Sequence, residues 1–209
     1  MSNDIDMSIE AMDDVPKFDP NAEPVLTRDA SHQYWLNGKR IPSVSSLLRR
    51  TGHTHEIPGF AQAAVELGTN VDDLLTYADT GRLHEFTIDP SADAWIEEYE
   101  QAKRELGITT WQKIRPMDWH REDLYAGEPD RVNPDLIADI KTGKNLYKHY
   151  RVQTALYGRI HKCRQRVIIW LRGSGTFDVA EQLVWYKDAT DFDEAERVVR
   201  SCQWRSRRQ

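Results

Sequence analysis

Hydrophobic and polar positions divide the chain into a helix-rich first half and a strand-rich second half. Apolar residues at helical spacing predict helices over 43–50, 59–79 and 91–106. Ser43 is the expected N-cap of the first helix, and Gly68 is a possible break in the second. Before these helices, Asn37-Gly38 separates two short segments, 32–36 and 39–41. This dipeptide predicts a two-residue hairpin.

After residue 110 the pattern favours strands, at 111–119, 123–132, 135–142, 165–172 and 176–186. Helices are expected at 145–162 and 191–207. Helices followed by strands that alternate with further helices indicate an α/β or α+β fold, with a central mixed sheet flanked by helices.

Composition restricts the class of protein. The 209 residues, 39% of them hydrophobic, suit one globular domain. No stretch has the roughly 18 consecutive apolar residues of a membrane helix. The N-terminus lacks a secretory pattern. Cys163 and Cys202 are too few for a disulfide framework. We therefore expect no membrane association and a cytoplasmic protein, located in the host cytoplasm if a phage encodes it.

The net charge of −6 comes from the first 23 residues, which hold seven acids and one base. This acidic segment has no hydrophobic periodicity, so 1–23 is expected to be a disordered tail and 24–209 the folded domain. The tail could simply aid solubility, compete with DNA for the basic body, or bind another protein. Within the body, 141–177 holds nine Lys or Arg and no acid.

Two acidic positions and one lysine form a candidate catalytic site. Asp130 follows Gly127-Glu128-Pro129, and Asp139 precedes Lys141 by two residues. On a strand, Asp139 and Lys141 would share one face. Carboxylates beside an ammonium group suit a hard cation such as Mg²⁺. Such a site could hydrolyse phosphodiester bonds.

The helix expected after this strand supplies a further polar residue. Gln153 lies in a helical stripe that also contains Tyr150 and Tyr157. A buried amide needs a hydrogen-bonding partner. From the sequence, the carboxylate–lysine site and a nearby backbone group are equally good partners for the Gln153 amide.

Taken together, these motifs resemble the PD-(D/E)XK nuclease superfamily, in its RecB-like and phage-type exonuclease branch. Asp130 matches G-x-P-D, Asp139 and Lys141 match D-x-K, and Gln153 with Tyr157 matches Q-x-x-x-Y. The resemblance covers most of residues 30–186 and is most specific over 125–157. It implies a restriction-endonuclease-like core.

The resemblance also implies the roles of individual residues. Asp130 and Asp139, with the Ile140 carbonyl, would bind Mg²⁺ or Mn²⁺, and Lys141 would position the attacking water. Gln153 and Tyr157 would orient the lysine and the scissile phosphate. DNA would be the substrate, in phage or bacterial recombination or repair. A single-strand annealing or recombination protein is a candidate partner.

The sequence departs from the family pattern at two positions. Asp72 follows Gly68-Thr69-Asn70-Val71, where the family usually has a metal-binding histidine. Aspartate could replace it as an oxygen ligand. Residues 114–117 also lack a glutamate that many members have. With two cysteines, the chain should have no four-cysteine iron–sulfur cluster.

Lys144 and Arg151 are the basic residues expected nearest the site, and we predict that they contact DNA phosphates. The leading hypothesis is therefore a Mg²⁺-dependent deoxyribonuclease, with exonuclease action favoured. The main alternative is a nuclease-fold protein that binds DNA as a scaffold after losing metal affinity. Polarity, strand preference and oligomeric state are not determined by the sequence.

Overall fold

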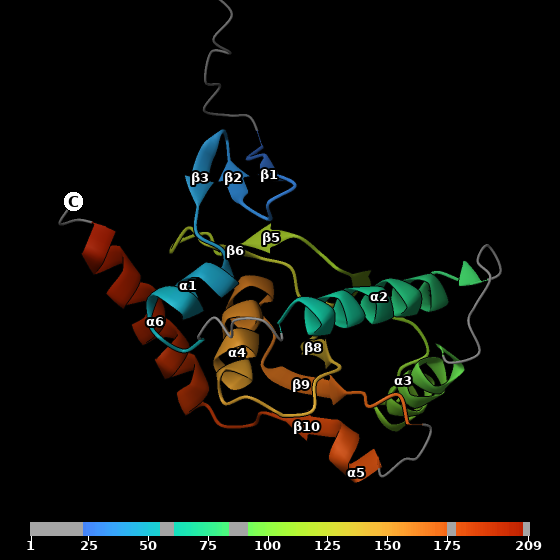
Figure 1. The fold of residues 1–209 in the computed structure, drawn as a ribbon. Helices are drawn as coiled ribbons and strands as arrows, with labels where there is room; N and C mark the ends of the chain where they lie inside the picture. The colour runs from blue at the N-terminus through green and yellow to red at the C-terminus, as the bar shows by residue number, and fades with distance from the viewer. Residues whose placement is uncertain (1–22, 55–60, 84–91, 175–178, 207–209) are drawn as a thin grey trace, which may run out of the picture.

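A five-stranded mixed sheet in the order β10-β9-β8-β7-β4 runs through the protein, and helices cover both of its faces (Figure 1). The computed structural model describes residues 23–54, 61–83, 92–174 and 179–206. Strands β8 and β9 pair in parallel, and the other neighbours pair antiparallel. The predicted α+β architecture with a central mixed sheet is confirmed.

The strands of this sheet are β4 (Lys113–Ile114), β7 (Arg131–Asn133), β8 (Leu136–Lys141), β9 (Gln165–Trp170) and β10 (Leu183–Trp185). Five shorter strands form two smaller sheets: β1 (Leu26–Arg28), β2 (Tyr34–Leu36), β3 (Lys39–Ile41), β5 (Asp118–Trp119) and β6 (Ala126–Gly127). The helices are α1 (Val44–Arg50), α2 (Ala61–Asp79), α3 (Asp93–Glu105), α4 (His149–His161), α5 (Val179–Gln182) and α6 (Thr190–Ser206).

Alternation along β8 sends its side chains into two different cores. Ile137 packs with residues of α1, α4 and α6 on one face of the sheet. Leu136, Ala138 and Ile140 pack with residues of α2 and α3 on the other. Because side chains of a strand alternate between faces, Asp139 and Lys141 share the side of Ile137. The expected orientation of β8 is therefore confirmed.

The N-terminal hairpin forms where it was predicted. Asn37 and Gly38 both have positive φ, at 50° and 75°, as a two-residue turn with a primed geometry requires. Ser43 caps α1, because its side chain accepts a hydrogen bond from the Ser46 N–H at 3.0 Å. Strand β1, which was not predicted, adds a third strand to the hairpin.

Two predicted strands are each broken near a proline. The strand expected at 111–119 is divided into β4 and β5, with Arg115 at a left-handed φ of 48° just before Pro116. The strand expected at 123–132 is divided into β6 and β7 around Pro129. Proline has no N–H to donate to a strand ladder, so it rarely continues an interior strand.

Other boundaries also differ from the prediction. Helix α2 is continuous through Gly68, and α4 begins at His149 rather than near 145. A strand was expected over 176–186. Residues 179–182 form the helix α5 instead, so the prediction is wrong there, whereas 183–185 form the strand β10 as predicted. Residues 175–178 lie outside the described residues. All of the predicted tail except Glu23 also lies outside them. Within the described ranges, no helix is long and apolar enough to cross a membrane.

Candidate active site

The centre of the site lies on β8, the middle strand of the main sheet. Asp139 is 2% exposed, and its Oδ2 lies 2.5 Å from Nζ of Lys141. The two groups form a buried ion pair, in which the Lys141 ammonium is the partner of the Asp139 carboxylate. The pairing follows from their two-residue spacing, which sends both side chains to one face.

Asp130 reaches the same strand from the segment between β6 and β7. Its Oδ2 accepts a hydrogen bond from the Ile140 N–H at 2.6 Å, so its carboxylate is held against the backbone between Asp139 and Lys141. Its own carbonyl accepts the Arg115 N–H at 2.9 Å. Residues nine to eleven positions apart in the chain thus meet at one point, as the two motifs predict.

Burial and crowding of carboxylates change the protonation equilibria of this cluster. Burial raises the pKa of Asp139 to about 7; Lys141 opposes this increase, while Asp130 adds to it. Burial also raises the pKa of Asp72 to about 6, with a further contribution from Asp130. The pKa of Lys141 is lowered by burial but raised more strongly by Asp139 and Asp130, so its ammonium form is favoured. Asp72, Asp130 and Asp139 are therefore within electrostatic range of one another.

Asp72 projects from α2 towards this cluster but is shared with two arginines. Its Oδ1 lies 3.2 Å from Nη1 of Arg131, and its Oδ2 lies 3.5 Å from Nε of Arg115. Arg115 also pairs with Asp73 at 2.9 Å and with Glu128 at 3.2 Å. The side chain predicted to replace the metal-binding histidine is thus near the site, and its charge is partly neutralised by guanidinium groups.

Tyr157 and Gln153 lie together on α4. The Gln153 Nε2 donates to the Tyr157 hydroxyl over 3.4 Å, a long hydrogen bond. Tyr157 is buried against β6: a Cβ at Gly127 would lie 2.6 Å from its ring. Burial raises the pKa of Tyr157 well above its ordinary value, and Asp139 adds to the increase. The hydrogen bond of the Gln153 amide is therefore made to Tyr157, the other residue of the Q-x-x-x-Y motif, rather than to the carboxylate–lysine pair or to the backbone.

An aromatic cluster beside Lys141 was not assigned a role from sequence. Nζ of Lys141 lies 5.1 Å from the centre of the Tyr150 ring, a cation–π distance. Tyr150 makes edge contacts with His149 and with Tyr147, which is 41% exposed. The signal available in the sequence was the position of Tyr150 on the predicted stripe, but its ring was interpreted only as part of the core.

The two predicted phosphate-binding residues have different surroundings. Lys144 is exposed in the segment that follows β8, where the Gly143 carbonyl accepts the Trp170 Nε1–H at 2.5 Å. Arg151 instead forms ion pairs with Asp191 at 2.7 Å and Glu194 at 2.5 Å on α6. Contact between Arg151 and a phosphate would have to compete with both pairs. Lys144, which is exposed, is therefore the better candidate for a contact with a DNA phosphate.

The donor set suits a hard divalent cation. Asp130, Asp139 and the Ile140 carbonyl provide oxygen atoms, the kind of ligand that Mg²⁺ prefers, and the Asp139 carboxylate is buried with Lys141 as its partner. In the described part of the chain, however, no three acidic, histidine or cysteine side chains gather closely enough to hold a metal by themselves. Each carboxylate instead has its own partner. Asp130 accepts the Ile140 N–H, Asp139 pairs with Lys141, and Asp72 pairs with Arg131. The residues present fit Mg²⁺ chemically, with two side chains and a backbone oxygen as the core ligands.

A hollow of about 310 Å³ opens beside Asp130. Its wall includes Asp72, Arg115, Glu128 and Tyr157. Acidic and basic side chains thus surround the space from which a phosphate could approach Asp130.

The fold and the site together define an α+β protein with a carboxylate–lysine cluster on the central strand of a mixed sheet. No family model matches the chain, and no curated protein matches it. Among solved structures, it is similar to an alkaline exonuclease (LHK-Exo) from Laribacter hongkongensis, with 12% sequence identity and a TM-score of 0.40. The match covers 76% of this chain and 84% of that one.

Proposed function

We propose that this protein is a metal-dependent deoxyribonuclease that hydrolyses phosphodiester bonds. The observation that carries the proposal is the convergence of Asp130, Asp139 and Lys141 on one strand. Asp130 is fixed by the Ile140 N–H at 2.6 Å, and Asp139 is paired with Lys141 at 2.5 Å. Burial and mutual interaction perturb the pKa values of Asp139 and Lys141, and perturbed groups of this kind are typical of functional sites.

In this proposal, Asp130 and Asp139 hold Mg²⁺ or Mn²⁺ together with the Ile140 carbonyl, and Asp72 contributes to the negative field. The bound cation would polarise the phosphate and lower the pKa of a water molecule. Lys141 stays protonated beside two carboxylates and so can donate hydrogen bonds to the attacking water or to a phosphate oxygen. Tyr157, held by Gln153, orients groups at the edge of the adjoining hollow. Lys144 and, if its ion pairs open, Arg151 would bind flanking phosphates.

The finer parts of the proposal follow from the motif resemblance. Exonuclease action, a role in phage or bacterial recombination or repair, and cooperation with a single-strand annealing protein are typical of that branch. A cytoplasmic site of action agrees with these roles. The polarity of digestion and the preferred strand are left for experiment.

The test is cleavage of end-labelled linear DNA, single- and double-stranded, with Mg²⁺, Mn²⁺ or EDTA. We expect metal-dependent cleavage by the wild type and a loss of at least about 100-fold for Lys141→Ala, because the lysine assists the reacting groups directly. Arg104→Ala is the matched control, since Arg104 is an exposed cation on α3 and should not affect cleavage. The distribution of label will distinguish exonuclease from endonuclease action.

A catalytically impaired, DNA-binding scaffold is the second candidate. Asp72 is engaged by Arg131 and Arg115, and no third side-chain ligand joins Asp130 and Asp139 among the described residues. DNA binding without cleavage under any metal would favour this candidate. Restoration of cleavage by Asp72→His would then identify the lost ligand as the cause.

A further inference from the structure

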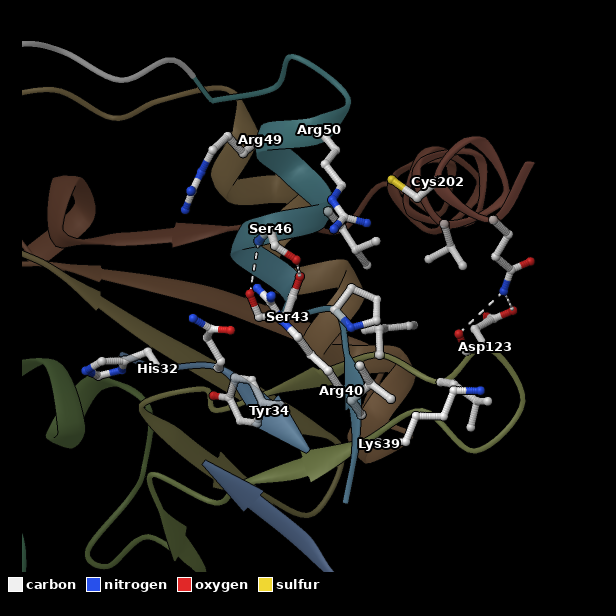
Figure 2. A pocket seen from close by; sticks show the side chains of 18 of the residues that line it. His32, Tyr34, Lys39, Arg40, Ser43, Ser46, Arg49, Arg50, Asp123 and Cys202 are labelled. Atoms are coloured by element: carbon white, nitrogen blue, oxygen red, sulfur yellow. Dashed lines mark hydrogen bonds between the residues drawn. The ribbon is translucent and has the colours of Figure 1, made fainter. Parts of the chain in front are cut away.

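A second and larger hollow lies between the N-terminal hairpin, α1 and α6. Its volume is about 800 Å³, and its remaining wall is the segment that precedes β6, at 122–125. Figure 2 shows Arg40 extending from the hairpin side towards Ser43, with Arg49 and Arg50 above it on α1. We call this hollow the hairpin groove.

The exposed side chains of the hairpin groove are mainly basic. Lys39, Arg40, Arg49 and Arg50 are all exposed and line it. Of the two acids in its wall, Asp123 is already paired with Arg159, at 2.5 Å. Glu122 is the other acid. The groove therefore carries an excess of positive charge, although the chain as a whole has a net charge of −6.

The hairpin groove continues into the hollow beside Asp130. Five residues line both spaces: Ser31, His32, Tyr34, Ser43 and Arg49. A polymer seated in the groove could thus extend into the hollow that Asp72 and Asp130 line. Two adjoining hollows suit a chain of several phosphates better than one small anion.

The chemistry of the groove suits a phosphate backbone rather than bases. Its two tyrosines, Tyr34 and Tyr125, are 6% and 0% exposed, so neither offers a free face for stacking, and His32 is the one exposed ring among the described residues of its wall. Arginine and lysine, by contrast, bind phosphates independently of sequence. The hairpin, α1, α6 and segment 122–125 all line the groove, and we take this enclosure to favour one strand over a duplex.

We propose that the hairpin groove binds a single strand of DNA through its phosphates and leads that strand to the Asp130–Asp139–Lys141 site. This inference rests on the proposed nuclease function and adds the path and strandedness of the substrate. The cations of the groove would neutralise successive phosphates, so binding should weaken as salt concentration rises. Recognition should be independent of base sequence.

The experiment measures fluorescence anisotropy of labelled single-stranded and duplex oligonucleotides with the full chain in EDTA, where metal-dependent cleavage cannot interfere. The test variant is Arg40→Ala/Arg49→Ala. The matched control is Arg104→Ala/Arg164→Ala, which removes two exposed arginines that do not line the groove. Thermal unfolding checks that both variants are folded.

We expect the groove variant to bind single-stranded DNA about tenfold more weakly at low salt, with the logarithmic salt slope reduced by about 1.4 for two lost phosphate contacts. The control should bind like the wild type. Equal affinity of the groove variant and the control would overturn the proposal. So would an absence of single-strand binding, or tighter binding of the duplex than of the single strand.

These outcomes are separate from those of the cleavage assay. If DNA is cut but the groove variant binds normally, the groove assignment fails and the nuclease proposal stands. If binding depends on the groove but no metal supports cleavage, the nuclease proposal fails and the groove assignment stands.

Discussion

Arg131 follows Asp130 in the chain, and its buried side chain contacts Asp72 beside the candidate site. It is 0% exposed, and its guanidinium contacts Asp79 at 2.7 Å, the Tyr99 hydroxyl at 3.1 Å and Asp72 at 3.2 Å. It therefore links β7 to α2 and holds one of the acids that face the catalytic cluster. A buried charge of this kind contributes little net stability while paired, but removing one partner is costly.

We predict that Arg131→Met destabilises the protein by about 3 kcal/mol, the lower end of the range for broken buried ion pairs. The cost should not be larger, because Lys103 still pairs with Asp79 at 3.0 Å. Urea unfolding measures the change. Arg104→Met, at an exposed position, should stay within about 0.5 kcal/mol of the wild type. If both variants behave alike, the Arg131 network is not a significant source of stability.

At the scale of elements, the break between β6 and β7 sets the geometry of the site. Pro129 ends strand pairing, and the chain then brings Asp130 to the Ile140 N–H of β8. Just before the break, Gly127 lets Tyr157 of α4 pack directly against β6. The glycine is needed for this close approach, since a Cβ there would also lie 2.9 Å from the Val44 side chain of α1.

We therefore predict that Gly127→Ala destabilises the protein by about 1–3 kcal/mol, as overpacking of a core does. It should also reduce cleavage, because the Tyr157 ring must move. Gly68→Ala is the matched control: its Cβ would meet only Thr142 Oγ1, at an ordinary 3.5 Å, within a continuous helix. That variant should be stabilised by roughly 0.5–1 kcal/mol, the usual gain from replacing a helical glycine. A stable, fully active Gly127→Ala would show that the packing can adjust.

Over the whole molecule, charge is distributed unevenly. The first 23 residues carry the entire net charge of −6, and the remainder is balanced. Within that remainder, three carboxylates gather at the candidate active site, and four exposed cations line the hairpin groove: Lys39, Arg40, Arg49 and Arg50. A covalently attached acidic segment has a high local concentration, so it can compete with DNA for these cations.

Deleting residues 1–23 should tighten binding of single-stranded DNA about threefold at low salt, if the tail competes electrostatically. The difference should disappear at high salt, where such interactions are screened. Anisotropy titrations of the two proteins at both salt concentrations provide the measurement. Unchanged affinity at low salt would leave the tail with a solubilising function or a protein-binding one.

The sequence by itself determined the local features of this protein. The Asn37-Gly38 turn, the Ser43 cap and the two faces of β8 depend on backbone preferences or on strand periodicity, which act over a few residues. The hairpin-length spacing between the two motifs also predicted that Asp130 would lie beside β8, where its carboxylate accepts the Ile140 N–H. The breaks at Pro116 and Pro129 could also have been predicted locally, because proline cannot donate to a strand ladder.

Only the tertiary structure decided which partners the charged residues have. Arg151 was expected to face DNA but pairs with Asp191 and Glu194, some 40 residues further along the chain. Asp72 meets Arg131 and Arg115, and Arg40 comes to share a groove with Arg49, through contacts between separate elements. Such contacts are set by how helices pack on the sheet, and no local periodicity encodes them. The reason is physical: electrostatic and packing energies depend on distances in space, whereas sequence patterns report only distances along the chain.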